Sequence, residues 1–348
     1  MKNNIYNFSL KALEEYFIAQ NDKKFRATQI FEWLYRHRVT LFEKMTNLSK
    51  KALEHLHEHF AIERLNVEKK IVSSDGTTKY LFRLHDGHLI ETVLMRHSYG
   101  NSVCVTSQVG CNMGCSFCAS GELGRIRNLT HAEMVLQVLH VQSELDATNE
   151  RVTNIVVMGI GEPFDNFQTV LDFCRTVNFA KGLEIGARHI TISTCGIVPK
   201  IFEFAEFKLQ VNLAISLHAP NDELRSKIMK INRSYPLHEV MEAVKAYLAK
   251  TNRRVTFEYI LLKDINDTTS HAHQLVNLLR GINCYVNLIP YNEVLTKEYK
   301  RTLPESAQVF FNVLHQAGIN VTFRTEHGDD IRAACGQLRA QTMKEKKR

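Results

Sequence analysis

The stretch SVCVTSQVGCNMGCSFCAS, residues 102–120, decides how this chain is interpreted. It places a strand-like run directly before a loop in which Cys111, Cys115 and Cys118 form a C-x3-C-x2-C pattern. Thiolates hold iron–sulfur clusters, and spacings this short let neighbouring cysteines reach separate irons of one cube. Because a ferredoxin cluster or a zinc site needs a further ligand nearby, the loop predicts a [4Fe-4S] cluster with one open iron. Structural zinc, with Cys104 as the fourth ligand, is the alternative.

An open iron can bind the amino and carboxylate groups of S-adenosylmethionine, and one electron then cleaves the sulfonium to a 5′-deoxyadenosyl radical. The protein's part in such chemistry is to position the cofactor and to exclude solvent. The run MGIGEP, residues 158–163, suits this task. Gly159 and Gly161 permit close backbone approach, and Glu162 can accept a hydrogen bond from the amino group. Taken alone, such a Gly-x-Gly-Glu run is usually only a turn.

Strand-like runs alternate with helical runs from the cysteine loop towards the end of the chain. The expected strand and helix pairs are 102–107 with 131–145, 153–161 with 166–177, 189–194 with 201–207, 211–219 with 237–250, 254–262 with 271–281 and 285–292 with 306–318, before a last strand at 320–326. Repeated βα units imply a parallel sheet with helices outside. We therefore expect an α/β fold, a partial TIM-like (βα)6 barrel whose site lies at the carboxyl ends of its strands. A doubly wound open sheet is the alternative.

The first 90 residues show a different pattern of apolar residues. Helical periodicity marks residues 10–20, 27–39 and 50–60. From Val67 the sequence alternates like strands, with Asp86–Gly87 at a hairpin turn. The expected division is an accessory domain at 1–90, mainly helical with a small β extension, the barrel at 91–340, and a basic disordered tail at 341–348.

Composition limits the class of protein. The 348 residues are 44% apolar, which is enough to bury a full core. No apolar stretch approaches a membrane span and the N-terminus lacks a secretion signal, so we expect a cytoplasmic protein with no membrane partner. In a reducing cytoplasm the eight cysteines are not expected to form a disulfide framework. Cys174 and Cys284 are expected to be small buried residues.

Seven motifs, in one order, are similar to those of the RlmN/Cfr family of radical-SAM RNA methyltransferases. They are VCVTSQVGCNMGCSFCAS, MGIGEP, ISTCGIVP, NLAISLHAPNDELRS, VTFEYILL, VNLIPYN and GDDIRAACGQL, and the match spans about Phe25 to Leu338. The resemblance implies a radical-SAM barrel and methylation of adenine C2, both in the peptidyl-transferase centre of 23S rRNA and next to the anticodon of tRNA. Cfr-type enzymes instead methylate C8 of the ribosomal adenine and confer antibiotic resistance. Pro163 resembles the C2 enzymes, since Cfr-like chains tend to have Ala there.

The resemblance also assigns three catalytic residues. Cys335 matches the methyl-carrying cysteine, Cys104 the resolving cysteine, and Glu91 a residue proposed as proton acceptor. It implies two S-adenosylmethionine molecules per turnover: one methylates Cys335, and the other yields the radical that removes a hydrogen from that methyl group. The carbon radical adds to adenine C2, and attack by Cys104 then forms a Cys104–Cys335 disulfide and frees the base. For Glu91, a solvated or salt-bridged residue is the alternative, and Cys104 is the rival for the proton.

Further residues are implied to bind the cofactor. They are Gly161, Glu162, Ser193, Ser216, Leu217, His218 and Asn292, each at the carboxyl end of an expected strand. The chain departs from the family at Lys230, where Pro is expected, and at Cys195, where Ser or Val is commoner. An electron donor such as flavodoxin or ferredoxin and a monomeric state are also expected.

The net charge of +7 fits a polyanionic partner, here 23S rRNA and tRNA. Candidate phosphate contacts are Lys23, Lys24, Arg26, Arg36, Arg38, Arg125, Arg127, Arg225, Lys227, Lys230, Arg233, Arg253 and Arg254. A solvated basic face is the alternative for any of them. A different class of function, an iron–sulfur RNA-binding redox sensor, is disfavoured because a sensor needs no methyl-carrying cysteine.

Overall fold

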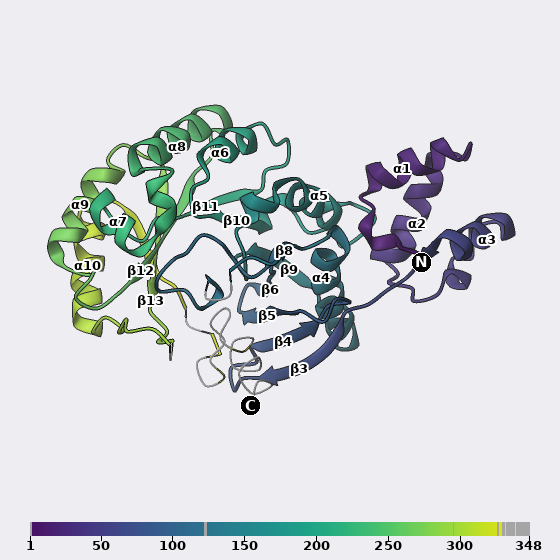
Figure 1. Ribbon diagram of the computed structural model, residues 1–348, viewed down its shortest axis with the longest axis horizontal. Coiled ribbons are helices and arrows are strands. Elements are labelled where there is room, and N and C mark those ends of the chain that lie inside the picture. The colour runs from purple at the N-terminus through teal and green to yellow at the C-terminus, as the bar shows by residue number, and fades with distance from the viewer. Residues whose placement is uncertain are drawn as a thin grey trace.

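The computed structural model describes residues 2–121, 124–294, 296–325, 327–328, 331 and 338. A ten-stranded sheet runs through the molecule in the order β14-β13-β12-β11-β10-β9-β6-β5-β4-β3 (Figure 1). Its strands are β3 (Asn66–Val72), β4 (Thr78–Arg83), β5 (Leu89–His97), β6 (Gly100–Cys104), β9 (Val152–Val157), β10 (Ile190–Thr194), β11 (Asn212–Ser216), β12 (Val255–Leu261), β13 (Cys284–Pro290) and β14 (Asn320–Phe323). The tail predicted at 341–348 lies outside the described residues.

The parallel part of the sheet consists of β6, β9, β10, β11, β12, β13 and β14. Each of these strands pairs with the next one in this order. The connecting helices are α4 (His131–Leu145), α5 (Phe167–Asn178), α6 (Val198–Ala205), α7 (Asp222–Ile228), α8 (Leu237–Thr251), α9 (Thr269–Leu279) and α10 (Pro304–Gln316). A doubly wound sheet reverses its strand order near the middle, and this one does not. The partial barrel is therefore confirmed, and Figure 1 shows α6, α8, α9 and α10 along its outer rim.

Local sequence explains where these elements begin and end. A capping box starts α4, with the Glu133 amide donating to the Thr130 hydroxyl and the Glu133 carboxylate accepting from the Thr130 amide. The strand predicted at 211–219 ends at Ser216, because His218 has a left-handed φ of 58°. On α8, buried Val240, Val244 and Tyr247 form the stripe that packs on the sheet.

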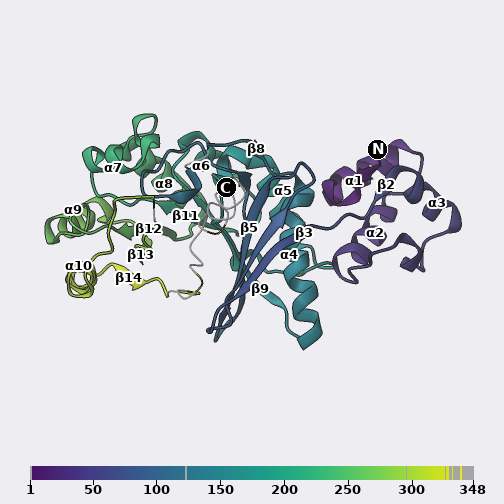
Figure 2. The same ribbon diagram turned by 60° about the horizontal axis from the view of Figure 1, so that its bottom comes forward.

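The strands β3, β4 and β5 are antiparallel and continue the same sheet beyond β6. The predicted hairpin turn joins β4 to β5: Gly87 has a φ of 83°, and the His88 amide donates to Asp86 Oδ1 at 3.2 Å. In Figure 2, β3 and β5 project as a long ribbon beyond the parallel strands. The expected boundary at residue 90 falls inside β5, so this extension shares backbone hydrogen bonds with the barrel.

The N-terminal helices α1 (Leu10–Ala19), α2 (Phe25–Tyr35) and α3 (Lys50–His59) lie to one side of the barrel, together with the short strands β1 (Asn3–Asn4) and β2 (Phe60–Ala61) (Figures 1 and 2). The helix predicted at 27–39 ends at Tyr35, and Arg38 has a φ of 53°. This unit contacts both ends of α4: Tyr6 O lies 2.6 Å from His131 Nδ1, the Ala132 amide donates to Asn7 Oδ1 at 3.3 Å, and Arg38 pairs at 2.6 Å with Asp146, which follows the helix. Among the described residues, no helix combines the length and apolar character of a membrane span.

Candidate active site

The cysteine loop is fixed at both ends. The strands β7 (Gln108–Val109) and β8 (Arg127–Asn128) pair antiparallel and close its base. Gly110 has a φ of 81°, and a side chain there would overlap the Gly124 carbonyl, so only glycine fits. In the middle of the loop, the amide and hydroxyl of Ser116 both donate to the carbonyl of Ile228 at the end of α7. The loop is therefore held as one piece against the carboxyl ends of the parallel strands.

Cys111, Cys115 and Cys118 line one cavity of about 190 Å³, which we call the cluster cavity. Burial raises the pKa of the Cys111 thiol to about 12, with the Cys118 sulfur among the smaller causes, and it raises the pKa of Cys115 as well. Bound iron reverses this tendency, since a coordinating thiol loses its proton. Within the described chain, no three His, Cys, Asp or Glu side chains converge as the ligands of a single ion do. Three thiols on one short loop fit a cube whose irons each take one thiolate.

Residues from three strand ends complete the cluster cavity. Gly161 and Glu162 follow β9, Ser193 belongs to β10 and Ser216 to β11, and all four were expected from the sequence. Gly161 has a φ of 113°, and a Cβ there would lie 2.6 Å from that of Gln108. The Ser193 and Ser216 hydroxyls are 3.3 Å apart. The structure therefore brings these four residues together around the cluster cavity.

The Glu162 carboxylate is buried and already has two backbone partners. It accepts from the amide of Phe164 at 3.0 Å and from the amide of Cys195 at 2.8 Å. Burial raises its pKa, and these hydrogen bonds act in the opposite direction. Side-chain hydrogen bonds from Cys195 and Thr194 add to the two from the backbone, and the residue lines the cluster cavity, where its negative charge would attract an ammonium group. Cys195, where the chain departs from its family, contributes its amide here and its side chain to the cavity lining.

His218 stands in the wall between this cavity and a second one. Its Nδ1 accepts from the Ile260 amide at 3.1 Å, so the neutral ring carries its proton on Nε2. Burial, assisted by the charge of Arg225, lowers the pKa of His218 to about 3. The ring meets Phe117 edge to face, with centroids 5.1 Å apart. His218 is therefore a neutral donor at a boundary that Phe117 and Cys118 share.

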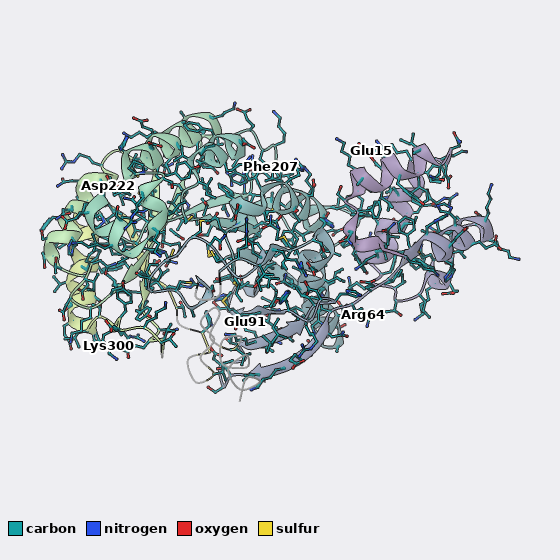
Figure 3. All side chains as sticks on the ribbon, viewed as in Figure 1. Glu15, Arg64, Glu91, Phe207, Asp222 and Lys300 are labelled. Carbon is teal, nitrogen blue, oxygen red and sulfur yellow. The ribbon has the colours of Figure 1, made fainter. Side chains whose placement is uncertain are left out.

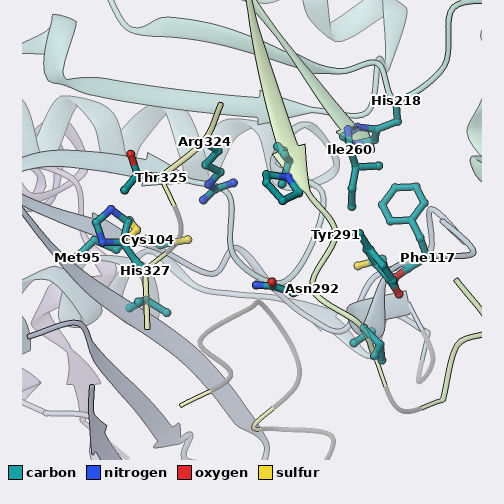
Figure 4. A pocket seen from close by; sticks show the side chains of 16 residues that line it. Met95, Cys104, Phe117, His218, Ile260, Tyr291, Asn292, Arg324, Thr325 and His327 are labelled. Carbon is teal, nitrogen blue, oxygen red and sulfur yellow. Dashed lines mark hydrogen bonds between the residues drawn. The ribbon is translucent and has the colours of Figure 1, made fainter. Parts of the chain in front are cut away.

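The second cavity, of about 270 Å³, contains Cys104, and we call it the Cys104 cavity (Figure 4). Cys104 comes from the end of β6 and Asn292 from just after β13, and Figure 4 shows them on different sides of the space. Val93 of β5 lies directly opposite Cys104 in the antiparallel pair, so both face this cavity. Asn292 thus lines the Cys104 cavity, whereas Gly161, Glu162, Ser193 and Ser216 line the cluster cavity and His218 lines both.

Glu91 lies on β5 near the middle of the molecule (Figure 3). It forms an ion pair with Lys79 at 3.0 Å, and both side chains are almost completely buried. Lys79 is opposite Val93 in the pairing of β4 with β5, so this pair shares a sheet face with Cys104. The described lining of neither cavity includes Glu91.

One further predicted residue, Leu217, lines neither cavity. Leu217 is buried in the main core, and its carbonyl accepts from Arg225 Nε at 3.1 Å. Cys335 lies outside the described residues. Leu338, three positions later in the sequence, packs with Leu81 and Leu89 of β4 and the start of β5.

Sequence reasoning misassigned one arginine. Arg225 of α7 was expected among the RNA contacts, but it is fully buried, which corrects that expectation. Its guanidinium donates to the carbonyls of Cys195 at 2.6 Å and Ser216 at 3.3 Å. It therefore ties together the ends of β10 and β11 that shape the cluster cavity. One signal in the sequence could have indicated this burial. Arg225 comes one turn after the helix cap Asn221, which places it on the inward face of a short helix.

Other expected RNA contacts are also engaged within the protein. Arg38 pairs with Asp146, Arg127 with Glu133 and Asp86, and Arg253 donates to backbone carbonyls of residues 210 and 211. A second residue that sequence reasoning missed is Arg324, which follows β14 and lines both cavities. The rule that found Ser193 and Asn292, a polar residue at a strand's carboxyl end, applies to Arg324 too.

Comparisons with known proteins agree with this site. Residues 3–62 match the family model described as the ribosomal RNA large subunit methyltransferase N-terminal domain, and residues 105–276 match the radical SAM superfamily. The chain is 58% identical to the "Probable dual-specificity RNA methyltransferase RlmN" of Bacillus licheniformis, covering 99% of this chain and 95% of that protein. It is also 58% identical to its namesake in Geobacillus kaustophilus, covering 99% and 94%.

A solved structure extends the likeness to three dimensions. The crystal structure of a radical SAM methyltransferase from Sphaerobacter thermophilus superposes with a TM-score of 0.91 at 43% identity, covering 96% of this chain and 98% of that one. The predicted fold, cofactor class and enzyme class are thereby confirmed. The chain belongs to the RlmN family of radical-SAM RNA methyltransferases, enzymes that use a [4Fe-4S] cluster and S-adenosylmethionine.

Proposed function

We propose that this enzyme methylates C2 of adenine, in the peptidyl-transferase centre of 23S rRNA and at the tRNA position next to the anticodon. The observation that carries the proposal is the shared wall: Phe117, Cys118 and His218 line both the cluster cavity and the Cys104 cavity. A thiol that would release a modified base thus lines the same cavity as one of the cluster cysteines, Cys118. The dual-specificity name of the relatives supports two RNA substrates.

The proposed roles follow from these positions. Cys111, Cys115 and Cys118 would hold the cluster, which together with S-adenosylmethionine supplies one-electron cleavage and a carbon radical. Such a radical can attack adenine C2, which is not nucleophilic enough for ordinary methyl transfer. Glu162 would pair with the cofactor's ammonium group, since this acidic residue lines the cluster cavity. Ser193, Ser216 and the Nε2–H of His218 would bind its remaining polar groups.

The Cys104 cavity would receive the target base, which has to be single-stranded or extruded to reach a buried thiol. Cys335 would carry the methyl group and Cys104 would attack its sulfur to form the disulfide that frees the product. Glu91 would take the proton from the adduct. Its pairing with Lys79 holds the carboxylate on the sheet face that carries Cys104, and Cys104 is the rival acceptor.

The surroundings of the reaction are also proposals. Residues 1–90 would recognise RNA, because Lys23, Lys24 and the half-exposed Phe25 lie together at the start of α2. The net charge of +7 agrees with a nucleic-acid substrate. We further propose a cytoplasmic monomer that receives electrons from a flavodoxin or ferredoxin.

Nucleoside mass spectrometry of cells with and without this gene tests the proposal. Deletion should remove 2-methyladenosine from both 23S rRNA and tRNA, and a plasmid copy should restore it. Loss of 8-methyladenosine alone would assign the Cfr-type reaction instead. Unchanged adenine modification in both RNAs would refute the proposed substrates.

A further inference from the structure

Arg324 lies where the two cavities meet, and the proposed reaction does not use it. It directly follows β14, and its amide donates to the carbonyl of Leu288 at 2.8 Å, which fixes its backbone at the carboxyl end of the sheet. Its side chain lines both cavities. Figure 4 shows the guanidinium pointing into the Cys104 cavity, with Cys104 on one side and Asn292 on the other.

The charge of Arg324 is unusual for its surroundings. Among the described lining residues of both cavities it is the single Lys or Arg. Within the same part of the chain, its guanidinium has no hydrogen bond or ion pair to a protein group. Arginine stays protonated and carries five N–H donors. A partly buried guanidinium whose donors have no protein acceptor is costly, so we expect a ligand to supply the acceptor.

An oxyanion is the ligand class that suits these donors, because carboxylates and phosphates accept two parallel hydrogen bonds from one guanidinium. The known reaction offers two sources, the carboxylate of S-adenosylmethionine and a phosphate of the RNA. The cluster cavity already contains the acidic residues Glu162 and Glu258. The described lining of the Cys104 cavity contains neither Asp nor Glu. An anion is therefore better stabilised by Arg324 on the Cys104 side.

We propose that Arg324 binds a backbone phosphate of the target nucleotide and so places its base beside Cys104. The inference rests on the proposed function, because it takes the Cys104 cavity as the place where the base enters. A phosphate contact positions a nucleotide without reading its sequence. The same arginine therefore serves rRNA and tRNA equally, which a dual-specificity enzyme requires at the one point that both substrates must share.

The test measures binding rather than turnover. The variants Arg324→Gln and Arg324→Lys are compared with the native enzyme, all anaerobically reconstituted with iron and sulfide and kept without reductant. Affinity for a tRNA anticodon stem-loop and for a 23S rRNA hairpin is followed by fluorescence anisotropy over a range of salt concentrations. Equilibrium dialysis gives the affinity for S-adenosylmethionine. Arg280→Gln is the matched control, since it removes one exposed positive charge at the carboxyl end of α9, where Arg280 donates to Asn277 Oδ1 at 2.7 Å.

We expect Arg324→Gln to weaken the binding of both RNAs about 10- to 100-fold, because a charged hydrogen-bonded pair contributes about that much to affinity. The slope of log affinity against log salt should become shallower by about 0.7, since one phosphate contact is lost. Arg324→Lys should keep that slope and lose part of the affinity, because it retains the charge without the planar fork. Binding of S-adenosylmethionine should stay unchanged, and Arg280→Gln should behave like the native enzyme.

Two results overturn the proposal. Native RNA affinity and salt slope in Arg324→Gln would mean that no phosphate is bound there. A weaker affinity for S-adenosylmethionine together with an unchanged affinity for RNA would mean that Arg324 binds the cofactor carboxylate instead. If Arg324→Gln fails to fold or to retain iron, Arg324→Lys decides, and native affinity for both RNAs in that variant counts against the proposal. The experiment measures binding and not methylation. Its outcomes therefore test the role of Arg324 even if the enzyme methylates a carbon other than C2.

Discussion

The cluster cavity and the Cys104 cavity share a wall but are built in opposite ways. The first gathers polar groups from consecutive parallel strands, with Glu162 after β9, Ser193 on β10 and Ser216 on β11. The second takes much of its lining from apolar residues, including Met95 of the antiparallel β5 and Ile260 of β12. A small charged cofactor needs convergent hydrogen bonds, whereas a flat base needs an apolar slot with few polar groups. The difference supports the proposal that the base enters the Cys104 cavity, to which the antiparallel β5 adds Val93 and Met95.

The largest expected effect concerns the cluster cavity. Replacing Cys111, Cys115 or Cys118 by Ala should abolish iron binding and activity, because each thiolate holds a separate iron. Iron content and the visible absorption of the anaerobically purified protein measure this. Cys174→Ala is the control, since that thiol is buried in α5 away from both cavities. Full iron content in a Cys115→Ala protein would contradict the assignment.

The second prediction separates the two cavities by chemistry. Cys104→Ala should keep its iron and its cofactor binding, yet it should stop after the base has been attacked. Protein covalently joined to RNA should then accumulate, visible as a shifted band on a denaturing gel that ribonuclease removes. Cys284→Ala, another buried thiol, should show no such band. Normal multiple turnover by Cys104→Ala would refute its resolving role.

The third prediction tests the sheet face beneath the Cys104 cavity. Lys79→Met removes the cation paired with the buried Glu91 carboxylate and should cost about 3–5 kcal/mol of unfolding free energy. The double variant Lys79→Met with Glu91→Leu should recover much of that loss, since it leaves no unpaired charge. Urea unfolding followed by circular dichroism measures both. Lys11→Met at the exposed Lys11–Glu15 pair is the control and should change stability little. A double variant as unstable as the single one would contradict this account.

The smallest effect concerns the shared wall. The unfolded chain protonates a histidine near pH 6.5, whereas burial lowers the pKa of folded His218 to about 3. The unfolded state therefore binds more protons as the pH falls below 6.5, and stability decreases, by about 2 kcal/mol between pH 7 and pH 5. His218→Gln should remove this part of the pH dependence from the urea unfolding free energy. The exposed His238→Gln should leave it in place. An unchanged pH dependence in His218→Gln would show that the imidazole is not held neutral.

Periodicity predicted the parallel barrel closely, because each of its strands and long helices carries its own apolar pattern. The helix expected at 131–145 has those bounds, and the one expected at 237–250 ends one residue later. The helix α7 escaped prediction because its seven residues, of which two are acidic and two basic, show no clear apolar stripe. The strands β7 and β8 escaped because two residues carry no period.

The candidate site was predictable to the extent that its residues occupy strand ends. Gly161, Glu162, Ser193 and Ser216 share one cavity, as the strand-end rule requires. Contacts that depend on tertiary packing were not accessible: the burial of Arg225 and the pairing of Lys79 with Glu91 join segments whose proximity no local pattern records. The assignment of Cys335 stays a prediction.

The wall formed by Phe117 and His218 limits how this enzyme can be altered. A substitution at either residue reshapes both chambers at once, so a gain in one is coupled to a loss in the other. Residues that line only the Cys104 cavity, such as Met95 and Val294, are free of this coupling. Laboratory evolution towards a new base should therefore accumulate changes at those positions first, and libraries that randomise the wall should yield mostly inactive proteins.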